Sequence, residues 1–114
     1  MITIYHNPSC SKSCKAISIL DEFGADFKVI DYLSDPPTEK ELRGLLLLLN
    51  ILAEDLIRKN EPVFLEKYVG SVKSEDEWIS IMCQNPVLIQ RPVLVDEKRA
   101  IIGRPAEKII EFLK

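Results

Sequence analysis

The segment YHNPSCSKSC (residues 5–14) contains the only histidine of the chain and two of its three cysteines. Because a short apolar run precedes it, Cys10 is expected where a strand turns into a helix. The first N–H groups of a helix are unpaired and carry a partial positive charge, which stabilises a thiolate. Lowering the pKa of a thiol from about 8.5 to about 6.5 would raise its ionised fraction at pH 7 from roughly 3% to roughly three quarters. The segment therefore predicts a nucleophilic Cys10.

Neighbouring side chains would strengthen this effect. His6, Lys12 and Lys15 would each add positive charge near Cys10, and the turn-forming pair Asn7–Pro8 would bring His6 toward the sulfur. Two other interpretations stay open. Cysteine is often buried and inert, so Cys10 could be an apolar filler of the core. His6 could equally be a strand-end residue that only bonds a carbonyl.

The arginines form a second candidate set. The chain has five, and Arg91 and Arg104 each precede a proline. Arg91 stands directly before an expected strand and Arg104 at the start of the expected last helix, so both can lie near the end of the first strand. A guanidinium presents a planar fork that matches a tetrahedral oxyanion. Together with a thiolate, these arginines predict attack on an oxyanion, although each one alone is typical of a solvated surface.

Alternating and apolar patterns place these residues on elements. Residues 2–5 and 27–32 predict strands, and residues 11–23 between them predict a helix that ends at Gly24. A strand, a helix and a strand within about thirty residues form a β-α-β unit with parallel strands. Cys10 is therefore expected just after the C-terminal end of the first strand of this unit.

The middle of the chain, about 38–85, is predicted to be a helical insertion. Capping boxes begin helices after Thr38 and Ser74, and a short helix is expected over 52–59. The apolar run 44–52 predicts a buried helix, since it is too short to span a bilayer. Cys83 is expected to pack in the core on the helix that begins after Ser74.

After this insertion, residues 91–102 predict a β-hairpin, and Pro105 is expected in the first turn of the last helix. The order is therefore β-α-β, a helical insertion, then β-β-α. We expect an α/β fold with a mixed sheet, formed by a single domain over residues 1–114.

Composition limits the function. The net charge of −3 and the pI near 5.2 argue against nucleic acid or an anionic membrane as a general partner. Three cysteines without a repeating framework, and a start that does not read as a signal peptide, indicate a reducing cytoplasm. One histidine and no paired cysteine clusters argue against a metal site, and four glycines without a phosphate loop argue against a nucleotide cofactor.

Four segments, ITIYHNPSCSKS, LIRKNEP, NPVLIQRPVLV and IGRPAEKIIEFL, together resemble the glutaredoxin-dependent arsenate reductases, the ArsC family with a thioredoxin-like fold. The resemblance covers nearly the whole chain. It implies that Cys10 attacks arsenate, that Arg58, Arg91 and Arg104 hold it, and that His6 helps to ionise the thiol. It further implies that glutathione and glutaredoxin, rather than a bound cofactor, supply the thiols that complete the reduction to arsenite. We expect a monomer.

The resemblance also implies a cis Arg91–Pro92 peptide bond, and it leaves two questions open. Cys14 stands where close relatives have an arginine, so it is either a resolving thiol for Cys10 or a buried residue that packs on the sheet. A bond between i and i+4 is strained when both residues are helical. An alternative to the enzyme is an Spx-like redox regulator that docks on RNA polymerase, although its switch is CxxC rather than CxxxC.

Overall fold

The computed structural model of the chain describes residues 1–114 apart from the side chain of Lys12. The predicted charge of Lys12 near Cys10 therefore lies outside the described residues. The chain forms two compact units. The first consists of Met1–Asp35 and Arg91–Lys114, and the second of Pro36–Gln90. The helical insertion predicted over 38–85 falls within the second unit.

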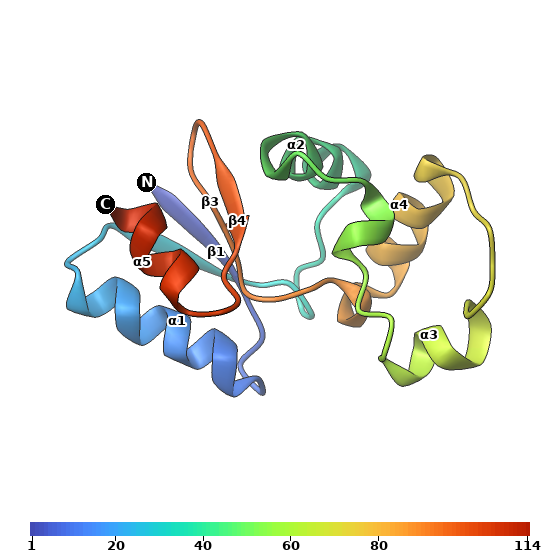
Figure 1. Cartoon of the computed structure of the whole chain (residues 1–114), viewed down its shortest axis with the longest axis horizontal. Coiled ribbons are helices and arrows are strands. Elements are labelled where there is room, and N and C mark those ends of the chain that lie inside the picture. The colour runs from blue at the N-terminus through green and yellow to red at the C-terminus, as the bar shows by residue number, and fades with distance from the viewer. The chain divides into compact units, whose positions relative to one another are not determined.

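The first unit is a four-stranded mixed sheet with two helices (Figure 1). Its elements are β1 (Ile2–His6), α1 (Ser11–Glu22), β2 (Phe27–Asp31), β3 (Val93–Val95), β4 (Ala100–Ile102) and α5 (Glu107–Leu113). The strand order is β2-β1-β3-β4. β1 is parallel to β2 and antiparallel to β3, which pairs antiparallel with β4. The predicted β-α-β unit, the hairpin and the mixed sheet are thus confirmed.

The core of this unit lies between the sheet and the two helices, and Figure 1 shows α1 and α5 side by side on one face of the sheet. Helical spacing brings one stripe of α1 to that face, because residues three and four apart share a side of a helix. The buried cluster consists of Ile4, Ala16, Ile19, Leu20, Leu94, Ile109 and Phe112. α1 ends at Glu22 with Phe23 as its C-cap, and Gly24, the predicted stop, follows with a φ of 65° that suits a residue without a Cβ.

The last helix begins later than expected. Pro105 lies in a bend before α5 rather than in its first turn. The N–H of Lys108 donates to the carbonyl of Pro105 at 3.0 Å, and the N–H of Ile109 to that of Ala106 at 3.0 Å. Both are i to i+3 bonds, so this stretch is a tight turn and regular α-helix starts only at Glu107.

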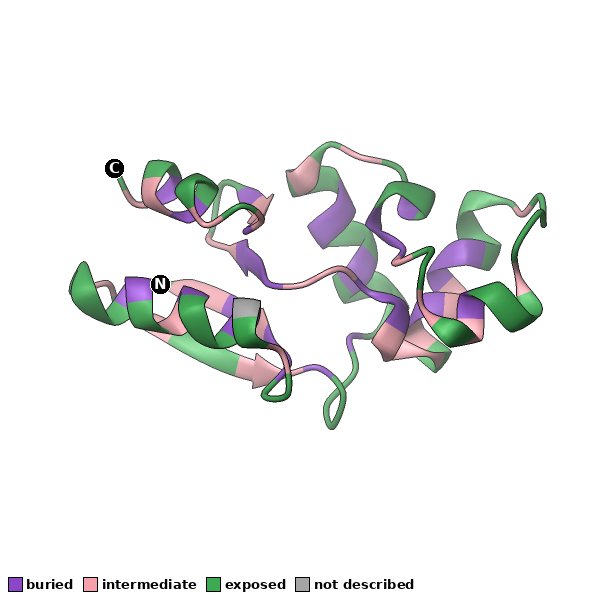
Figure 2. Cartoon of the chain, turned by 60° about the horizontal axis from the view of Figure 1, so that its bottom comes forward, coloured by how far each residue is buried: buried purple, intermediate pink, exposed green. Residues whose placement is uncertain are grey.

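The second unit is helical, and its helices carry buried and exposed residues side by side (Figure 2). Its elements are α2 (Glu39–Leu49), η1 (Ala53–Leu56), α3 (Pro62–Lys67), α4 (Glu75–Gln84) and η2 (Pro86–Leu88). Both predicted capping boxes are present. In the first, Thr38 Oγ1 accepts from the N–H of Glu41 at 3.1 Å, and the N–H of Thr38 donates to the Glu41 side chain at 3.0 Å.

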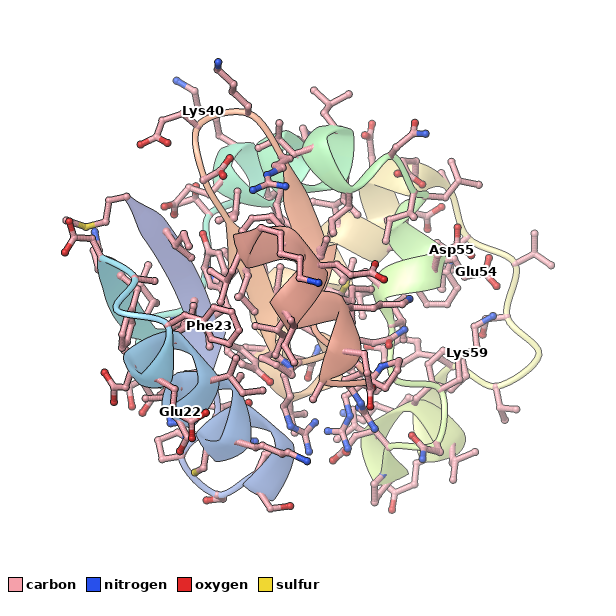
Figure 3. The ribbon with its side chains drawn as sticks, turned by 60° about the vertical axis from the view of Figure 1, so that its left-hand side comes forward. Glu22, Phe23, Lys40, Glu54, Asp55 and Lys59 are labelled. Atoms are coloured by element: carbon pink, nitrogen blue, oxygen red, sulfur yellow. The ribbon has the colours of Figure 1, made fainter. Side chains whose placement is uncertain are left out.

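The helix predicted over 52–59 is wrong, because only the 3₁₀ turn η1 forms there. The chain then becomes extended and pairs with a distant segment. The N–H of Arg58 donates to the carbonyl of Leu88 at 2.7 Å, and the N–H of Gln90 donates to that of Leu56 at 2.9 Å. Lys59 closes the segment through an ion pair with Glu54 at 2.7 Å (Figure 3). Long-range backbone bonds thus override the local helical preference.

The apolar run 44–52 is only partly buried, which corrects its interpretation as a buried helix. Leu45 and Leu46 are buried, whereas Leu47 is 82% exposed. A surface helix buries one stripe and leaves the other to solvent. Asn50 ends the helix in a left-handed conformation. Among the described residues, no helix is both long and apolar enough to cross a lipid bilayer.

The helix α3 is not predicted by the sequence pattern. Pro62 occupies the start of this helix, where its lack of an N–H costs nothing. Phe64 on α3 stacks on Trp78 of α4 with ring centroids 6.0 Å apart, and Tyr68 meets Trp78 edge-on at 6.2 Å. Pro62 before an apolar pair was the signal that could have revealed it.

Gly103 is expected to tolerate no side chain. A Cβ there would lie 2.9 Å from Cγ1 of Ile109 and 3.1 Å from Cγ of Pro92. We predict that Gly103→Ala lowers the free energy of unfolding by about 1–3 kcal/mol, as overpacking does. Gly44 is the matched control, because a Cβ on it meets nothing within 4 Å in the middle of α2. Gly44→Ala should stabilise the protein by about 0.5–1 kcal/mol in urea unfolding. Equal effects of the two substitutions would contradict the packing argument.

Candidate active site

The register of the sheet brings the ends of three strands together. β3 is antiparallel to β1 with Tyr5 opposite Val93, so β3 begins beside the end of β1. β4 pairs Ile102 with Val93, so β4 ends at that same edge. The N–H of Gly103 donates to the carbonyl of Pro92 at 2.8 Å and holds the two loops together. This edge of the first unit therefore carries four of the predicted site residues: His6, Cys10, Arg91 and Arg104.

Cys10 is the N-cap of α1, as the sequence predicts for a residue between a strand and a helix. The loop before it is a tight turn. The N–H of Cys10 donates to the carbonyl of Asn7 at 2.9 Å, and the N–H of Ser9 donates to Oδ1 of Asn7 at 2.9 Å. The buried Ser13 accepts the N–H of Asn7 at 3.4 Å. These bonds fix the half-buried Cys10 where the unpaired amides of α1 begin.

His6 is the last residue of β1, opposite Asp31 of β2. Its ring is buried, and its Nδ1 has no hydrogen-bond partner among the described residues. Burial lowers the pKa of His6, and the nearby Asp31 carboxylate only partly opposes this. The imidazole is therefore largely neutral at pH 7, which corrects the expectation that it supplies positive charge. A neutral ring can instead accept a proton.

Arg91 has buried hydrogen-bond donors that no described residue accepts from. It is half-buried, and its buried Nε and Nη1 have no hydrogen-bond partner among the described residues. Buried donors in proteins are nearly always paired, because an unpaired one costs free energy. A guanidinium with two such donors fits an anion held in a fork. The Arg91–Pro92 bond is cis, as expected, and so is Arg104–Pro105.

A family model described as the ArsC family matches residues 5–112. The chain belongs to the ArsC family. An arsenate reductase of Escherichia coli K12 is 36% identical over 113 residues, which cover 98% of this chain and 80% of that protein. An uncharacterised protein of the same strain is 39% identical over 114 residues, covering 98% of this chain and 96% of that protein.

The same family supplies structural neighbours. The solved structure of an arsenate reductase from Vibrio cholerae superposes with a TM-score of 0.91 at 36% identity, covering 96% of this chain and 95% of that one. The predicted thioredoxin-like α/β fold is therefore confirmed. The likeness runs through both units, since the matched residues 5–112 include the whole second unit.

Arg58, the third arginine implied by the ArsC resemblance, lies in the second unit. Its Nη1 contacts Oε2 of Glu61 at 2.9 Å and donates to the carbonyl of Val87 at 3.2 Å. The side chain is only 17% exposed. Arg58 is thus held in a fixed position by its own unit. In contrast, two buried donors of Arg91 have no hydrogen-bond partner among the described residues.

Cys14 is exposed, so the interpretation of this residue as a buried packing residue is wrong. α1 buries Ser13 and Ala16 against the sheet, and Cys14 follows Ser13 by about 100° around the helix. Its Sγ donates to the carbonyl of Pro8 at 3.6 Å, and it is a free thiol. Cys83 is half-buried rather than fully in the core, and burial raises the pKa of its thiol.

Sequence reasoning predicted the turn at Asn7 but missed Ser13 and Gly103, which also support the site. Asn7 and Ser13 shape the Cys10 loop, and Gly103 shapes the meeting of β3 with β4. The Asn-Pro pair and the glycine before Arg104 were the available signals. Among the described residues, no three His, Cys, Asp or Glu side chains group so as to hold a metal ion.

The buried His6 should make stability fall in mild acid. Its pKa is lowered in the folded state, whereas the unfolded chain has the ordinary value of about 6.5. Below that pH the unfolded state binds the proton more readily, so the free energy of unfolding falls as the pH drops from 7.5 to 5.5. We predict a shallower fall for His6→Asn in urea unfolding at the two pH values. Parallel curves for the two proteins would show that His6 does not titrate in this way.

Proposed function

We propose that this protein is an arsenate reductase in which Cys10 is the nucleophile. The observation that carries the proposal is the pair of unpartnered buried donors on Arg91, at the sheet edge that also holds the N-cap Cys10. Arg91 and Arg104 bind the arsenate oxygens and neutralise their charge. The family resemblance adds Arg58 as the third cation of this site.

The reaction proceeds by thiol chemistry. His6 in its neutral form accepts the Cys10 proton, and the thiolate attacks arsenic while one arsenate oxygen leaves as water. Glutathione thiolate then attacks the Cys10 sulfur. The new S–S bond forms as the S–As bond breaks, and its electron pair reduces As(V) to As(III), which leaves as arsenite. Glutaredoxin removes the glutathione from Cys10 by thiol–disulfide exchange.

The proposal also covers the thiol donor, the cellular location and the oligomeric state. Glutathione and glutaredoxin supply the two electrons, so no bound cofactor takes part, and we expect a cytoplasmic monomer. The alternative of a redox regulator that docks on RNA polymerase is not favoured, because named relatives at 36% identity are arsenate reductases. The CxxxC spacing of Cys10 and Cys14 also differs from the CxxC switch of such regulators.

A coupled assay tests the proposal. With glutathione, glutaredoxin and glutathione reductase present, the protein should oxidise NADPH only when arsenate is added. Phosphate in place of arsenate is the control, because it has the same shape and charge but is not reduced. Omitting glutaredoxin should stop the steady turnover. No arsenate-dependent oxidation with any thiol donor would contradict the proposed activity.

Glutathione rather than Cys14 is expected to resolve the Cys10 adduct. We predict that Cys14→Ser keeps its glutathione-dependent rate within about two-fold, because i to i+4 geometry is poor for a disulfide unless the helix opens. Mass spectrometry after turnover should show Cys10 joined to glutathione. A Cys10–Cys14 disulfide in the wild type, together with an inactive Cys14→Ser protein, would instead make Cys14 the resolving thiol.

A further inference from the structure

The second unit contains an open pocket, which we call the leucine groove, lined by residues of α2, η1 and α4. Its volume is about 550 Å³, and all of its lining residues belong to this unit. The apolar part of the lining consists of Leu46, Leu47, Ile51, Leu52 and Ile79. The proposed reaction uses none of these residues, so the leucine groove has no role in the function assigned above.

Two leucines of the leucine groove lie open to solvent. Leu47 is 82% exposed and Leu52 is 65% exposed, whereas Leu46 and Ile79 are buried. The chain turns between the two exposed leucines, because Asn50 ends α2 in a left-handed conformation. Large apolar side chains that stay exposed around a concave surface are typical of sites where another protein binds. A small-molecule site encloses most of its ligand, which walls as exposed as these do not.

Two carboxylates line the leucine groove without a cation of their own. Asp55 and Glu75 form no ion pair with any described residue. Oδ2 of Asp55 accepts from the N–H of Leu52 at 3.2 Å, and Oε2 of Glu75 accepts from the N–H of Ala53 at 2.9 Å. These bonds hold both carboxylates at the groove, but the neutral backbone donors leave their negative charge uncompensated.

The surroundings of the leucine groove do not neutralise this charge. Arg43 is the one cation among its described lining residues, and it is paired with Asp76 at 2.7 Å. The second unit has nine acidic and six basic side chains, whereas the first unit has nine of each. The net charge of −3 therefore lies entirely in the unit that contains the leucine groove.

We propose that the leucine groove binds a basic, apolar segment of a partner protein. Large apolar side chains of that segment fill the groove between Leu47 and Leu52, and flanking lysines or arginines pair with Asp55 and Glu75. The apolar anchors supply most of the affinity. The complementary charge orients the segment and rejects acidic ones, which would bring like charges together.

A peptide selection on the full chain tests the proposal. A phage library of random peptides is selected on the immobilised protein, and the enriched peptides are synthesised with a fluorescent label. We expect these peptides to carry large apolar residues flanked by lysine or arginine. Failure to enrich any peptide would overturn the proposal, and so would enrichment of peptides that lack basic residues.

Fluorescence polarisation then locates the binding site. Leu47→Ser should raise the Kd of the tightest peptide at least about ten-fold, as the loss of a central apolar contact does. Leu65→Ser is the matched control, because Leu65 is a 52% exposed leucine on α3 that does not line the groove. This control should leave the Kd unchanged. Equal effects of the two substitutions would place the peptide elsewhere and overturn the assignment.

Asp55→Asn tests the recognition of charge. Asparagine keeps an oxygen for the N–H of Leu52 but removes the negative charge, so the Kd should rise about two- to five-fold, the size of one exposed ion pair. Added salt should weaken binding to the wild type more than to the variant. Glu66→Gln is the control, since Glu66 is an exposed acid on α3 outside the groove. A Kd that responds neither to salt nor to Asp55→Asn would contradict the proposed basic partner.

Two further measurements separate this proposal from its alternatives. Sedimentation of the wild type at increasing concentration should show no self-association through the groove. Self-association that Leu47→Ser abolishes would make a second copy of this chain the occupant and overturn the proposal. Arsenate-dependent NADPH oxidation should be the same in Leu47→Ser as in the wild type, because the groove takes no part in the chemistry. If the selected peptides bind but arsenate is never reduced, only the proposed function fails.

Discussion

Replacing Cys10 with serine is expected to reduce arsenate-dependent NADPH oxidation to background, a loss of at least about a thousand-fold, as for other catalytic nucleophiles. A serine hydroxyl stays protonated at neutral pH, and its oxygen cannot form the disulfide that carries the electrons away from Cys10. Arsenate binding should survive, because Arg91 and Arg104 remain. The coupled assay gives the rate, and thermal unfolding with and without arsenate reports binding.

Cys83→Ser is the control for this substitution. Cys83 is half-buried on α4, and burial raises the pKa of its thiol, so its loss should leave the rate unchanged. Alkylation of the wild type against pH adds an independent test, since the N-cap position predicts that Cys10 reacts at lower pH than an ordinary thiol. A Cys10→Ser protein with wild-type activity would end the catalytic assignment.

Replacing Arg91 with lysine is expected to lower kcat/KM for arsenate about a hundred-fold, in the range seen when one partner of a buried charge pair is removed. Nε and Nη1 of Arg91 are buried and unpartnered among the described residues. A lysine ammonium is a point charge that cannot reproduce two parallel donors. The loss should appear in the KM for arsenate as well as in kcat, because binding and charge neutralisation both depend on the fork.

Thermal unfolding separates binding from catalysis at Arg91. Arsenate should raise the Tm of the wild type, since a ligand that binds only the folded state stabilises it. In Arg91→Met this rise should vanish, while the Tm without arsenate should not fall, because an unpaired buried guanidinium is itself costly. Arg43→Lys is the control, since Arg43 is 46% exposed in a surface ion pair. A lowered Tm for Arg91→Met without arsenate would mean that Arg91 stabilises the fold rather than binding an anion.

Local features of this protein could be predicted from its sequence. The capping box at Thr38, the stop at Gly24 and the place of Cys10 between a strand and a helix all follow from interactions within a few residues. Such signals act on the backbone nearby, so they can be identified from the sequence alone. The resemblance of four segments to the ArsC family added the thioredoxin-like fold and the third arginine, Arg58.

Predictions from local sequence patterns were wrong where distant segments of the chain form competing contacts. The segment 52–59 has a helical pattern, but its backbone bonds to residues 88–90 instead. One of the two interpretations of Cys14 placed it against the sheet, yet the core takes the stripe of α1 that contains Ser13 and Ala16. Which stripe of a helix is buried depends on what packs against it, and the sequence of the helix alone does not contain that information.

The arrangement of the charged side chains at the sheet edge depends on long-range strand pairing. The antiparallel register of β3 with β1 puts Arg91 beside the end of β1, about eighty residues away in the chain, and the hairpin brings Arg104 to the same edge. The unpartnered donors of Arg91 appear only once these pairings are made. Register is a non-local property, set by which faces of the strands are buried together, so no stretch of sequence specifies it alone.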